Sequence, residues 1–567
     1  MKKPVNIIYG VDETPPFLVT LLSGVQLVGL TSIYLLIPLA VCREAGLDRP
    51  AVQDVLSLSM LVLALGANLQ AFRRGPVGSG FLAPTIFTSA YLPASLLAAK
   101  MGGMALVSGM TVFGGLLNAG LSRLLRHLRP FFPPEVAGFV VVMIGITTGS
   151  LGLRNFLGIG TSQPGNPRDL LAAFVSLGIM VALNVWSKGS LRVLCALIGM
   201  AAGYAVAAMA GRLHGSDLAV LSAAPIVRWP HLGHVGWSFD AGLVIPFAVA
   251  GLATCLRAMA DITTCQKIND AEWVRPDLRS ISGGVLADSL ATVVTGLVGS
   301  TGVSTHTASV GLTNATGVTS RRVALAIGGV FVFLALMPKL AAVLAIIPPP
   351  VMGASLLFVT AFTLVNGLQI IASRMLDARR TFVFGLAFMG GLAVDLYPNF
   401  FEGLPPSLRP FAGSSFVLGT LAAVGLNLLF RLGVRRTQAF RIDRENPEPL
   451  KIEEFMESQG AAWGARRDVI DRASFNLTQS VETIVESCKP EGPLEIAASF
   501  DEFNLDIMVT YAGAPLELPE TRPRNEEIMA SEEGQRKLAG FMVRRSADWV
   551  QSSYKNGRST VLFHFDH

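Results

Sequence analysis

Charge is scarce in this sequence. Charged residues make up 15% of the 567 residues, whereas hydrophobic residues make up 51%, and the mean hydropathy is +0.52. A soluble chain carries roughly a quarter charged residues. The composition therefore excludes an ordinary soluble globular protein and indicates a membrane protein.

Cysteine is scarce as well. The chain has five cysteines, and they show no paired spacing: Cys42, Cys195, Cys255, Cys265 and Cys488. This pattern excludes a disulfide framework and a zinc site made of closely spaced cysteines. We therefore expect no metal and no other cofactor, and no residue pattern predicts catalysis.

The scarcity of charge ends near residue 436. Residues 1–436 hold 17 acidic and 30 basic residues, whereas residues 437–567 hold 23 acidic and 15 basic ones. We predict two domains with this boundary, a membrane domain and a small, soluble, acidic domain. The net charge of +5 averages the two parts and gives no indication of a nucleic-acid partner.

Long apolar runs fill the membrane domain. A run of about 20 apolar residues can cross the hydrocarbon core. The first run is too long for the apolar region of a cleavable signal peptide. Fourteen spans are predicted, near residues 16–41, 53–71, 81–99, 103–121, 133–153, 168–187, 191–210, 241–262, 282–299, 304–318, 322–346, 350–372, 378–396 and 411–431.

The third and tenth runs are weak. One begins with the glycine-rich stretch Gly78–Thr85, and the other contains the polar stretch Ser304–Ser309. Such segments are typical of broken half-helices that line a cavity. They hold the same position in two halves of seven spans each, which indicates two inverted repeats with a site between them.

Basic residues support this arrangement. If the N-terminus is cytoplasmic, the cytoplasmic connections are rich in arginine, for example at Arg73 and Arg74, Arg321 and Arg322, and Arg435 and Arg436. The opposite connections are poorer in basic residues. The positive-inside rule therefore places both termini in the cytoplasm of a multi-pass protein of the plasma (inner) membrane.

Few ionisable residues lie inside the apolar runs. Arg257 and Asp261 are four residues apart in the eighth run, so they share a helix face and can form an ion pair. Because a lone charge is costly in lipid, both are functional candidates, and the alternative is a purely structural ion pair. Asp288 is expected to cap or stabilise the ninth run. His306 is expected to be a polar packing group rather than a proton carrier.

Several motifs, taken in their order and spacing, resemble the nucleobase–ascorbate transporters, also called xanthine/uracil permeases. The similarity extends across most of residues 9–431. The resemblance implies a 14-span fold of two inverted seven-span repeats, divided into a core and a gate domain. It also implies a homodimer in the lipid membrane that moves nucleobases by proton symport. The motifs are Tyr9–Asp12, Gly24–Gln26, Leu197–Met200, Ala287–Leu290, Ile346–Gly353 and Ser414–Phe416.

The resemblance also assigns site residues. Arg257 occupies the position of the family's substrate-binding glutamate. Asp261, one turn later, occupies the position of its proton-linked residue and is the expected ion-coupling group. Phe81 is similar to an aromatic residue that stacks on a base. The implied substrate-binding residues are Arg257, Phe81, Ala308, Ser309, Gly311 and Gln26, and the implied structural polar residues are Asp288 and Thr316.

An arginine in place of the family's glutamate changes the expected substrate. A carboxylate accepts hydrogen bonds from the N–H groups of a base, whereas a guanidinium only donates them. A guanidinium beside the N-termini of half-helices suits an anion, such as an ionised purine. Two alternatives remain open: a small-anion transporter on the same fold, and a membrane receptor that signals through its C-terminal domain.

The segment 466–567 resembles a GHKL-type ATPase domain, an α/β sandwich of the kind found in anti-sigma-factor kinases. The resemblance implies a nucleotide-binding helix near Ser474–Glu486, but Glu486 stands where an asparagine would bind magnesium. Tyr511 replaces the aspartate that would contact adenine, and Leu538–Phe541 is similar to a shortened glycine-rich lid. We expect a degenerate cytoplasmic domain that contacts a regulatory partner and does not hydrolyse ATP.

Overall fold

The computed structural model divides the chain into two compact units. The first contains residues 1–368 and 387–423, and the second contains residues 369–386 and 424–567. The structure describes residues 2–73, 75–128, 134–159, 164–188, 190–212, 225–233, 236–273, 276–372, 375–405, 414–430, 437–444, 448–501, 504–524, 528, 531–555 and 557–566.

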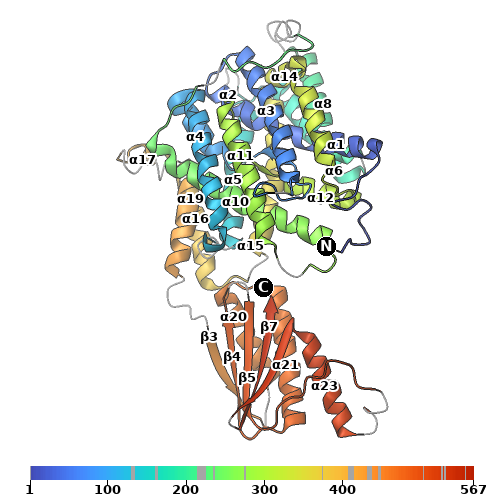
Figure 1. Ribbon diagram of the computed structural model, residues 1–567. Helices are drawn as coiled ribbons and strands as arrows, with labels where there is room; N and C mark the ends of the chain where they lie inside the picture. The colour runs from blue at the N-terminus through green and yellow to red at the C-terminus, as the bar shows by residue number, and fades with distance from the viewer. Residues whose placement is uncertain are drawn as a thin grey trace. The chain divides into compact units, whose positions relative to one another are not determined.

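The first unit is helical (Figure 1). Three of its helices, α15, α16 and α19, have one end in the second unit. In chain order the helices are α1 (Phe17–Ser32), η1 (Ile33–Leu35), α2 (Leu36–Glu44), α3 (Arg49–Ala71), α4 (Leu92–Leu128), α5 (Pro134–Phe156), α6 (Pro167–Trp186), α7 (Ser190–Val193), α8 (Cys195–Met209), η2 (Ala241–Leu243), α10 (Val244–Asn269), α11 (Leu278–Leu297), α12 (Thr307–Thr316), α13 (Val323–Ala335), α14 (Pro338–Ala345), α15 (Pro349–Ala372), α16 (Ala378–Leu396), α17 (Pro398–Glu402) and α19 (Ser415–Phe430).

The lengths of these helices agree with a membrane protein. Among the described residues, eight helices are long and apolar enough to cross a membrane, or nine if α13 and α14, which meet at 78°, form one span. The helices α8 and α19 are shorter but also apolar. An α-helical multi-pass membrane protein is therefore confirmed, and the number of fourteen spans stays a prediction.

Short polar residues start several of the helices. Asp48, Asn166 and Asp277 precede α3, α6 and α11, and each side chain accepts a hydrogen bond from a backbone N–H in the first turn. Such caps satisfy backbone donors that have no partner within the helix. The predicted third and fourth spans share the single helix α4, which is interrupted at Gly102 and Gly103. Gly103 has φ 64°, a conformation that glycine adopts at little cost.

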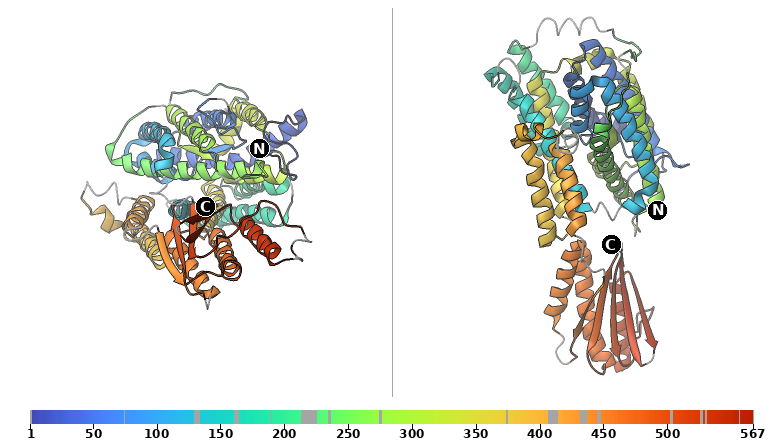
Figure 2. Two further views of the ribbon diagram at one scale, coloured as in Figure 1. Left: turned by 60° about the horizontal axis from the view of Figure 1, so that its bottom comes forward. Right: turned by 90° about the vertical axis from the view of Figure 1, so that its left-hand side faces the viewer.

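The third and tenth predicted segments begin as strands. Strands β1 (Thr85–Phe87) and β2 (Val303–Thr305) pair antiparallel, with Thr85 opposite Thr305, and all of their residues are buried. The strand β1 is followed by α4, and β2 is followed directly by α12. Each strand supplies backbone partners to the other, as non-helical backbone inside a membrane protein requires. The helices α10 and α11 lie side by side with α4 and pack on β2 (Figures 1 and 2).

The second unit contains a five-stranded antiparallel sheet in the order β3-β4-β5-β7-β6 (Figure 1). Along β4 buried and half-buried residues alternate, so one face of the sheet packs against helices and shares their hydrophobic core. The unit is thus a two-layer α/β structure. Its elements are β3 (Thr437–Ile442), α20 (Pro449–Trp463), α21 (Arg467–Cys488), β4 (Leu494–Phe500), β5 (Asn504–Ala512), α23 (Glu532–Ser546), β6 (Trp549–Lys555) and β7 (Arg558–Asp566).

The connection between α15 and α16 is part of this second unit. Arg380, in the first turn of α16, donates hydrogen bonds to the carbonyl oxygens of Ala461 (2.5 Å) and Ala462 (3.3 Å) at the end of α20. The backbone N–H of Met375 donates to the carbonyl of Ala465, and the Met375 side chain packs on the core. Gly464 has φ 66°, and a Cβ there would collide with the Arg380 guanidinium. Local sequence patterns could not predict this attachment, because it joins segments about 80 residues apart.

Two of the segments chosen by resemblance to a nucleotide-binding domain lie as expected along the chain. Ser474–Glu486 falls within α21, where Glu482 and Glu486 are exposed. Tyr511 lies near the end of β5, is buried, and donates a hydrogen bond to the carbonyl oxygen of Ala514 (3.1 Å). Its ring therefore fills the interior where the resemblance would place a nucleotide contact.

The third segment differs from expectation. Leu538–Phe541 lies inside α23 and not in a glycine-rich loop. The physical reason is the packing of Gly540, because a Cβ there would collide with the carbonyl oxygen of Glu517. Gly540 thus permits close contact between a helix and a neighbouring segment, which is a structural role and not that of a lid.

Candidate functional site

The strand β2 and the start of α12 bring most of the candidate residues of the membrane unit together. Asp261, on α10, is buried, and both of its oxygens accept hydrogen bonds from hydroxyl groups. The donors are Thr305 (Oγ1 to Oδ2, 2.9 Å) and Thr307 (Oγ1 to Oδ1, 2.6 Å). The predicted ion pair with Arg257 is wrong as a direct contact, because within the described residues the two threonines are the partners of Asp261. Hydroxyl donors at this distance suit an ionised carboxylate.

Asp288, on α11, holds the other side of the same strand. Its Oδ1 accepts a hydrogen bond from Gln70 Nε2 (2.6 Å), and its Oδ2 accepts from the backbone N–H of Thr305 (2.8 Å) and from Ser304 Oγ (3.2 Å). Thr305 therefore bridges two buried carboxylates, through its backbone to Asp288 and through its hydroxyl to Asp261. These contacts favour a structural role for Asp288, as predicted, since three donors fix it against β2 and α3.

His306 lies between β2 and α12 and has both ring nitrogens occupied. Nδ1 is 2.8 Å from Ser309 Oγ, and Nε2 is 3.0 Å from the hydroxyl of Tyr34 on η1. The rings of Tyr34 and His306 pack edge to face, with centroids 4.8 Å apart. Buried and fully partnered, His306 has the contacts of the polar packing group that the sequence suggested.

Arg257 is the exception in this polar cluster. It is half-buried on α10, one turn before Asp261, and its charge acts on Tyr34, Asp261 and His306. Within the described part of the chain, its guanidinium makes no hydrogen bond and no ion pair of 4 Å or less. Five N–H donors are therefore available to a ligand, in a fork that matches planar acceptors.

The remaining predicted residues lie on different sides of α12. Ala308 and Gly311 are exposed on one face of the helix, and a Cβ at Gly311 would meet no atom within 4 Å. Ser309 is buried and holds His306. Thr316 bonds back to the carbonyl of Leu312 (3.0 Å) at the end of the helix. The open face with Ala308 and Gly311 leaves room for a flat ligand.

Two predicted residues stand apart from this face. Phe81 is buried in a hydrophobic cluster with Cys255, Ala258 and Val310, so its ring packs between helices in this conformation. Gln26 is half-buried on α1. Sequence reasoning missed Tyr34 and Gln70, and it assigned no individual role to Ser304 and Thr305 on β2 or to Thr307 on α12. The available signal was the density of hydroxyl residues in the tenth apolar run.

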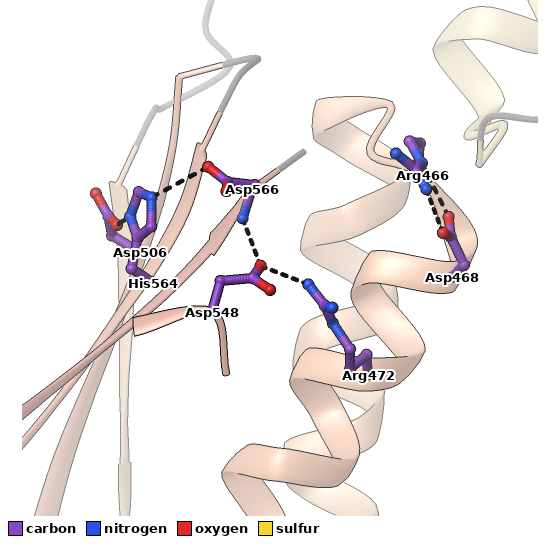
Figure 3. Close-up of polar contacts among 7 residues, drawn as sticks. All are labelled: Arg466, Asp468, Arg472, Asp506, Asp548, His564 and Asp566. Carbon is purple, nitrogen blue, oxygen red and sulfur yellow. Dashed lines mark hydrogen bonds and ion pairs between the residues drawn. The ribbon is translucent and has the colours of Figure 1, made fainter. Parts of the chain in front are cut away.

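A second polar cluster lies at one end of the C-terminal sheet (Figure 3). His564 Nδ1 is 2.5 Å from Asp506 Oδ1, and Nε2 is 3.5 Å from Asp566 Oδ1. Asp548 accepts from the Asp566 backbone N–H (2.9 Å) and from Arg472 on α21 (2.6 Å). Partial burial alone would lower the pKa of His564, but the hydrogen bond and charge of Asp506, with Asp566, raise it above its usual value. The cluster ties β5, β6, β7 and α21 together.

Neither cluster is a metal centre. Among the residues that the structure describes, no group of three or more histidine, cysteine, aspartate or glutamate side chains could hold a metal ion. The cysteines are unpaired thiols, four of them buried and Cys488 half-buried.

Three known proteins match about three quarters of this chain. The transmembrane domain of a cyanobacterial bicarbonate transporter, BicA, aligns with a TM-score of 0.43 at 16% identity, over 72% of this chain and 96% of that one. The xanthine permease XanP of Escherichia coli is 29% identical over 444 residues, 75% of this chain and 95% of its own length. The xanthine permease XanQ of the same organism is 26% identical over 446 residues, 76% of this chain and 95% of its own.

A family-level match covers most of the membrane unit. The sequence model of the Permease family (Xan_ur_permease) matches residues 19–400, more than half of the chain. The matched region contains Arg257, Asp261, Asp288 and both strands of the polar cluster. The chain therefore belongs to this permease family, and it is a transporter and not an enzyme.

Proposed function

We propose that the protein is a secondary active transporter of nucleobases or related planar heterocycles, bound in anionic form at Arg257. The names of its relatives XanP and XanQ support the substrate class. The observation that carries the anionic form is the guanidinium of Arg257, which has no protein partner among the described residues. An unpaired cation inside a membrane protein is costly, so a ligand that supplies the missing negative charge is favoured.

The surroundings of Arg257 support a flat anion. The exposed face of α12 at Ala308 and Gly311 offers space for a ring. The first turn of α12 presents backbone N–H groups and the positive end of its dipole towards the region of β2. The exocyclic oxygens and the deprotonated ring nitrogen of an ionised purine can accept charge-assisted hydrogen bonds from a guanidinium, and these are stronger than the bonds that the neutral purine would accept.

Asp261 is the proposed ion-coupling residue. It lies one helical turn from Arg257, and the charge of Arg257 acts on it. A bound anion and the Asp261 carboxylate would compete for the same guanidinium. That competition would link substrate binding to the uptake of a proton or another cation, because the two events share one electrostatic interaction.

The arrangement in the membrane is also part of the proposal. Fourteen segments would form two inverted repeats, with β1–α4 and β2–α12 as the interrupted members, and the protein would be a plasma-membrane homodimer with both termini cytoplasmic. Residues 1–436 would form the transporter and residues 437–567 the cytoplasmic domain. The antiparallel pairing of β1 with β2 supports the repeats, and the arginine distribution supports the orientation.

The C-terminal domain is proposed to be a degenerate relative of GHKL ATPases that regulates transport or binds a cytoplasmic partner. Its two-layer α/β structure supports the resemblance to GHKL ATPases. Nucleotide binding is disfavoured because Tyr511 is buried and Glu486 is exposed. Calorimetric titration of the full chain with magnesium and ATP should give no heat of binding. Micromolar affinity for ATP would refute the proposal that this domain is degenerate.

Uptake of labelled xanthine into proteoliposomes tests the transport function. Arg257→Ala should lower substrate affinity by the value of one charge-assisted interaction, about 1.5–3 kcal/mol or roughly 10- to 150-fold. Arg257→Lys should retain part of the affinity. Lys267→Ala, which removes a positive charge from the exposed end of the same helix, is the control and should change little.

The dependence of substrate affinity on pH tests whether Arg257 binds an anionic substrate. Wild-type affinity should rise as the substrate ionises, and Arg257→Ala should lose that dependence. Unchanged affinity in well-folded Arg257→Ala protein would place the arginine outside the site. A panel of sulfate, bicarbonate and uracil decides between a heterocycle and a small inorganic anion, a second candidate that the arginine also favours. Binding without uptake would indicate a receptor.

A further inference from the structure

The hydroxyl group of Tyr34 is a second polar group beside Arg257 that retains hydrogen-bonding capacity. Tyr34 lies on the short helical turn η1, between α1 and α2, and its side chain is half-buried. Among the described residues its hydroxyl has one hydrogen-bond partner, Nε2 of His306 at 3.0 Å. The charge of Arg257 acts on both Tyr34 and His306, so the hydroxyl and the guanidinium belong to one site.

The hydrogen bonds of His306 can run in two directions. A neutral histidine ring has one nitrogen that donates and one that accepts. The neutral ring is favoured here, because a protonated ring would place a second cation beside Arg257. The donors therefore run either from Tyr34 through His306 to Ser309, or from Ser309 through His306 to Tyr34.

The environment of Ser309 favours the second direction. Its hydroxyl is buried, and within the part of the chain that the structure describes its one hydrogen-bond partner is Nδ1 of His306, 2.8 Å away. If Nδ1 carried the ring proton, Nδ1 would donate to Ser309, and the hydroxyl proton of Ser309 would be buried without an acceptor. The second direction leaves only the hydroxyl proton of Tyr34 without a protein acceptor. It costs less, because half-buried Tyr34 can donate to water or to a ligand.

This direction makes Tyr34 a hydrogen-bond donor that is available to a ligand. Ser309 donates to Nδ1, the Nε2–H group of His306 donates to the Tyr34 oxygen, and the Tyr34 O–H group remains available. Hydrogen bonds in a chain polarise one another, so the two bonds behind this O–H group strengthen it as a donor. The rings of Tyr34 and His306 pack edge to face, with centroids 4.8 Å apart, and this contact holds the hydroxyl in place.

We propose that Tyr34 donates a hydrogen bond to the anion that Arg257 binds, so that η1 and α10 together recognise two neighbouring acceptor atoms of one ligand. The identity of the anion rests on the proposed function, but the direction of the hydrogen bonds does not. An exocyclic oxygen beside a deprotonated ring nitrogen offers such a pair of acceptors. A site rejects ligands that leave its polar groups unpaired, so Tyr34 is a specificity-determining residue. Ser309 is a positioning residue, because it acts through His306.

The affinity for xanthine tests the contact in the purified full chain. Tyr34→Phe removes the hydroxyl and keeps the ring, and it should weaken the binding of labelled xanthine roughly tenfold or more, the usual cost of a lost hydrogen bond to a charged group. The ratio of the wild-type and variant affinities should shrink as the pH falls and xanthine becomes neutral, because charge-assisted hydrogen bonds are the stronger ones. A ratio that does not change with pH would overturn the contact with the anion.

Tyr91→Phe is the matched control. It removes the same atom from another tyrosine of this unit, whose hydroxyl accepts a hydrogen bond from Asn118 (3.3 Å) and not from His306. Both variants leave one donor of the protein without its acceptor, so both are expected to melt at a lower temperature than the wild type. The xanthine affinity of Tyr91→Phe should stay near the wild-type value. An equal loss of affinity in the two variants would show general destabilisation and refute the contact.

The direction of the hydrogen bonds has a test that needs no ligand. ¹⁵N NMR of the histidine-labelled full chain distinguishes a ring nitrogen that carries a proton from one that does not, and His306→Gln identifies the signals of His306. The proton should lie on Nε2 in the wild type. Ser309→Ala removes the donor to Nδ1, so the proton should distribute between the two nitrogens and the xanthine affinity should fall severalfold. A proton on Nδ1 in the wild type would overturn the proposal, because the ring would then accept the Tyr34 proton.

The nucleobase proposal and the Tyr34 proposal fail in different ways. Xanthine binding that is weakened in Arg257→Ala but unchanged in Tyr34→Phe would refute the Tyr34 contact alone. No xanthine binding by the wild type, with the His306 proton on Nε2, would refute the nucleobase proposal and support the direction of the hydrogen bonds.

Discussion

The neutral substitution Asp288→Asn should destabilise the membrane unit strongly. In the wild type, Oδ1 accepts from Gln70, and Oδ2 accepts from Thr305 and Ser304, all in a buried environment. Asparagine has one acceptor oxygen. If that oxygen serves Thr305 and Ser304, the new NH₂ group faces the Gln70 NH₂ group, and two donors oppose each other.

A rotation of the Gln70 amide would relieve part of this clash between donors, and it therefore limits how much folding free energy Asp288→Asn loses. Its Oε1, which has no partner within the described residues, could then accept from the new NH₂ group. The same rotation removes the hydrogen bond from Gln70 Nε2 to the Gly284 carbonyl (2.8 Å). The loss of one such bond and of the charge assistance at Asp288 amounts to about 2–4 kcal/mol.

The assay is the melting temperature of the purified full chain in detergent, with xanthine uptake measured in parallel. Ser304→Ala is the graded control, because it removes only the longest of the three bonds to Asp288, worth about 1 kcal/mol, together with the 3.5 Å bond from Ser304 to the Thr254 carbonyl. The expected order of melting temperatures is wild type, then Ser304→Ala, then Asp288→Asn. A wild-type melting temperature for Asp288→Asn would refute this reasoning. Lost uptake at unchanged stability would move Asp288 from a structural role into the transport reaction.

Three further outcomes are expected. Gly540→Ala should make the C-terminal domain more sensitive to limited proteolysis, because the added Cβ collides with the Glu517 carbonyl; unchanged sensitivity would contradict this packing. Because folding raises the pKa of His564 above the usual 6.5, its stabilising effect is present at low pH and is lost as pH rises through that pKa. Protease resistance of the domain should therefore fall as the pH rises above 6.5, and His564→Gln, which breaks the charge pair with Asp506, should remove that slope; an equal slope in the variant would exclude the histidine. A cysteine in place of exposed Thr437 should resist an impermeant thiol reagent in whole cells if the domain is cytoplasmic, and labelling without lysis would reverse the orientation.

Local sequence patterns predicted the helical elements well. Apolar runs bounded by short polar residues such as Asp48 and Asn166 became helices, because hydropathy and capping act over a few residues. The weakness of the third and tenth runs also had a local cause. Glycine and hydroxyl residues disfavour a lipid-facing helix, and the structure places strands in both runs. Nothing local indicated that these strands would pair with each other.

Contacts between distant segments account for the differences. Helical spacing predicted that Arg257 and Asp261 could pair, but Asp261 instead binds one hydroxyl from β2 and one from α12, more than 40 residues away. Tyr34 and Gln70 entered the cluster for the same reason, since their partners lie in the other half of the chain. The motif at Leu538–Phe541 was assigned by its glycine, and a glycine serves a loop and a tight helix contact equally well.

The pairing of β1 with β2 has a consequence for synthesis of the chain. Thr85 and Thr305 are partners 220 residues apart, so the first strand leaves the ribosome long before the second exists. At 5–20 residues per second, the interval is roughly 10–45 s. During that time the backbone of β1 lacks the hydrogen bonds that an apolar surrounding demands. Neither half of the chain can therefore complete its fold until the other half is present. A ribosome that stalls between α8 and α10 leaves an N-terminal fragment that cannot finish folding alone.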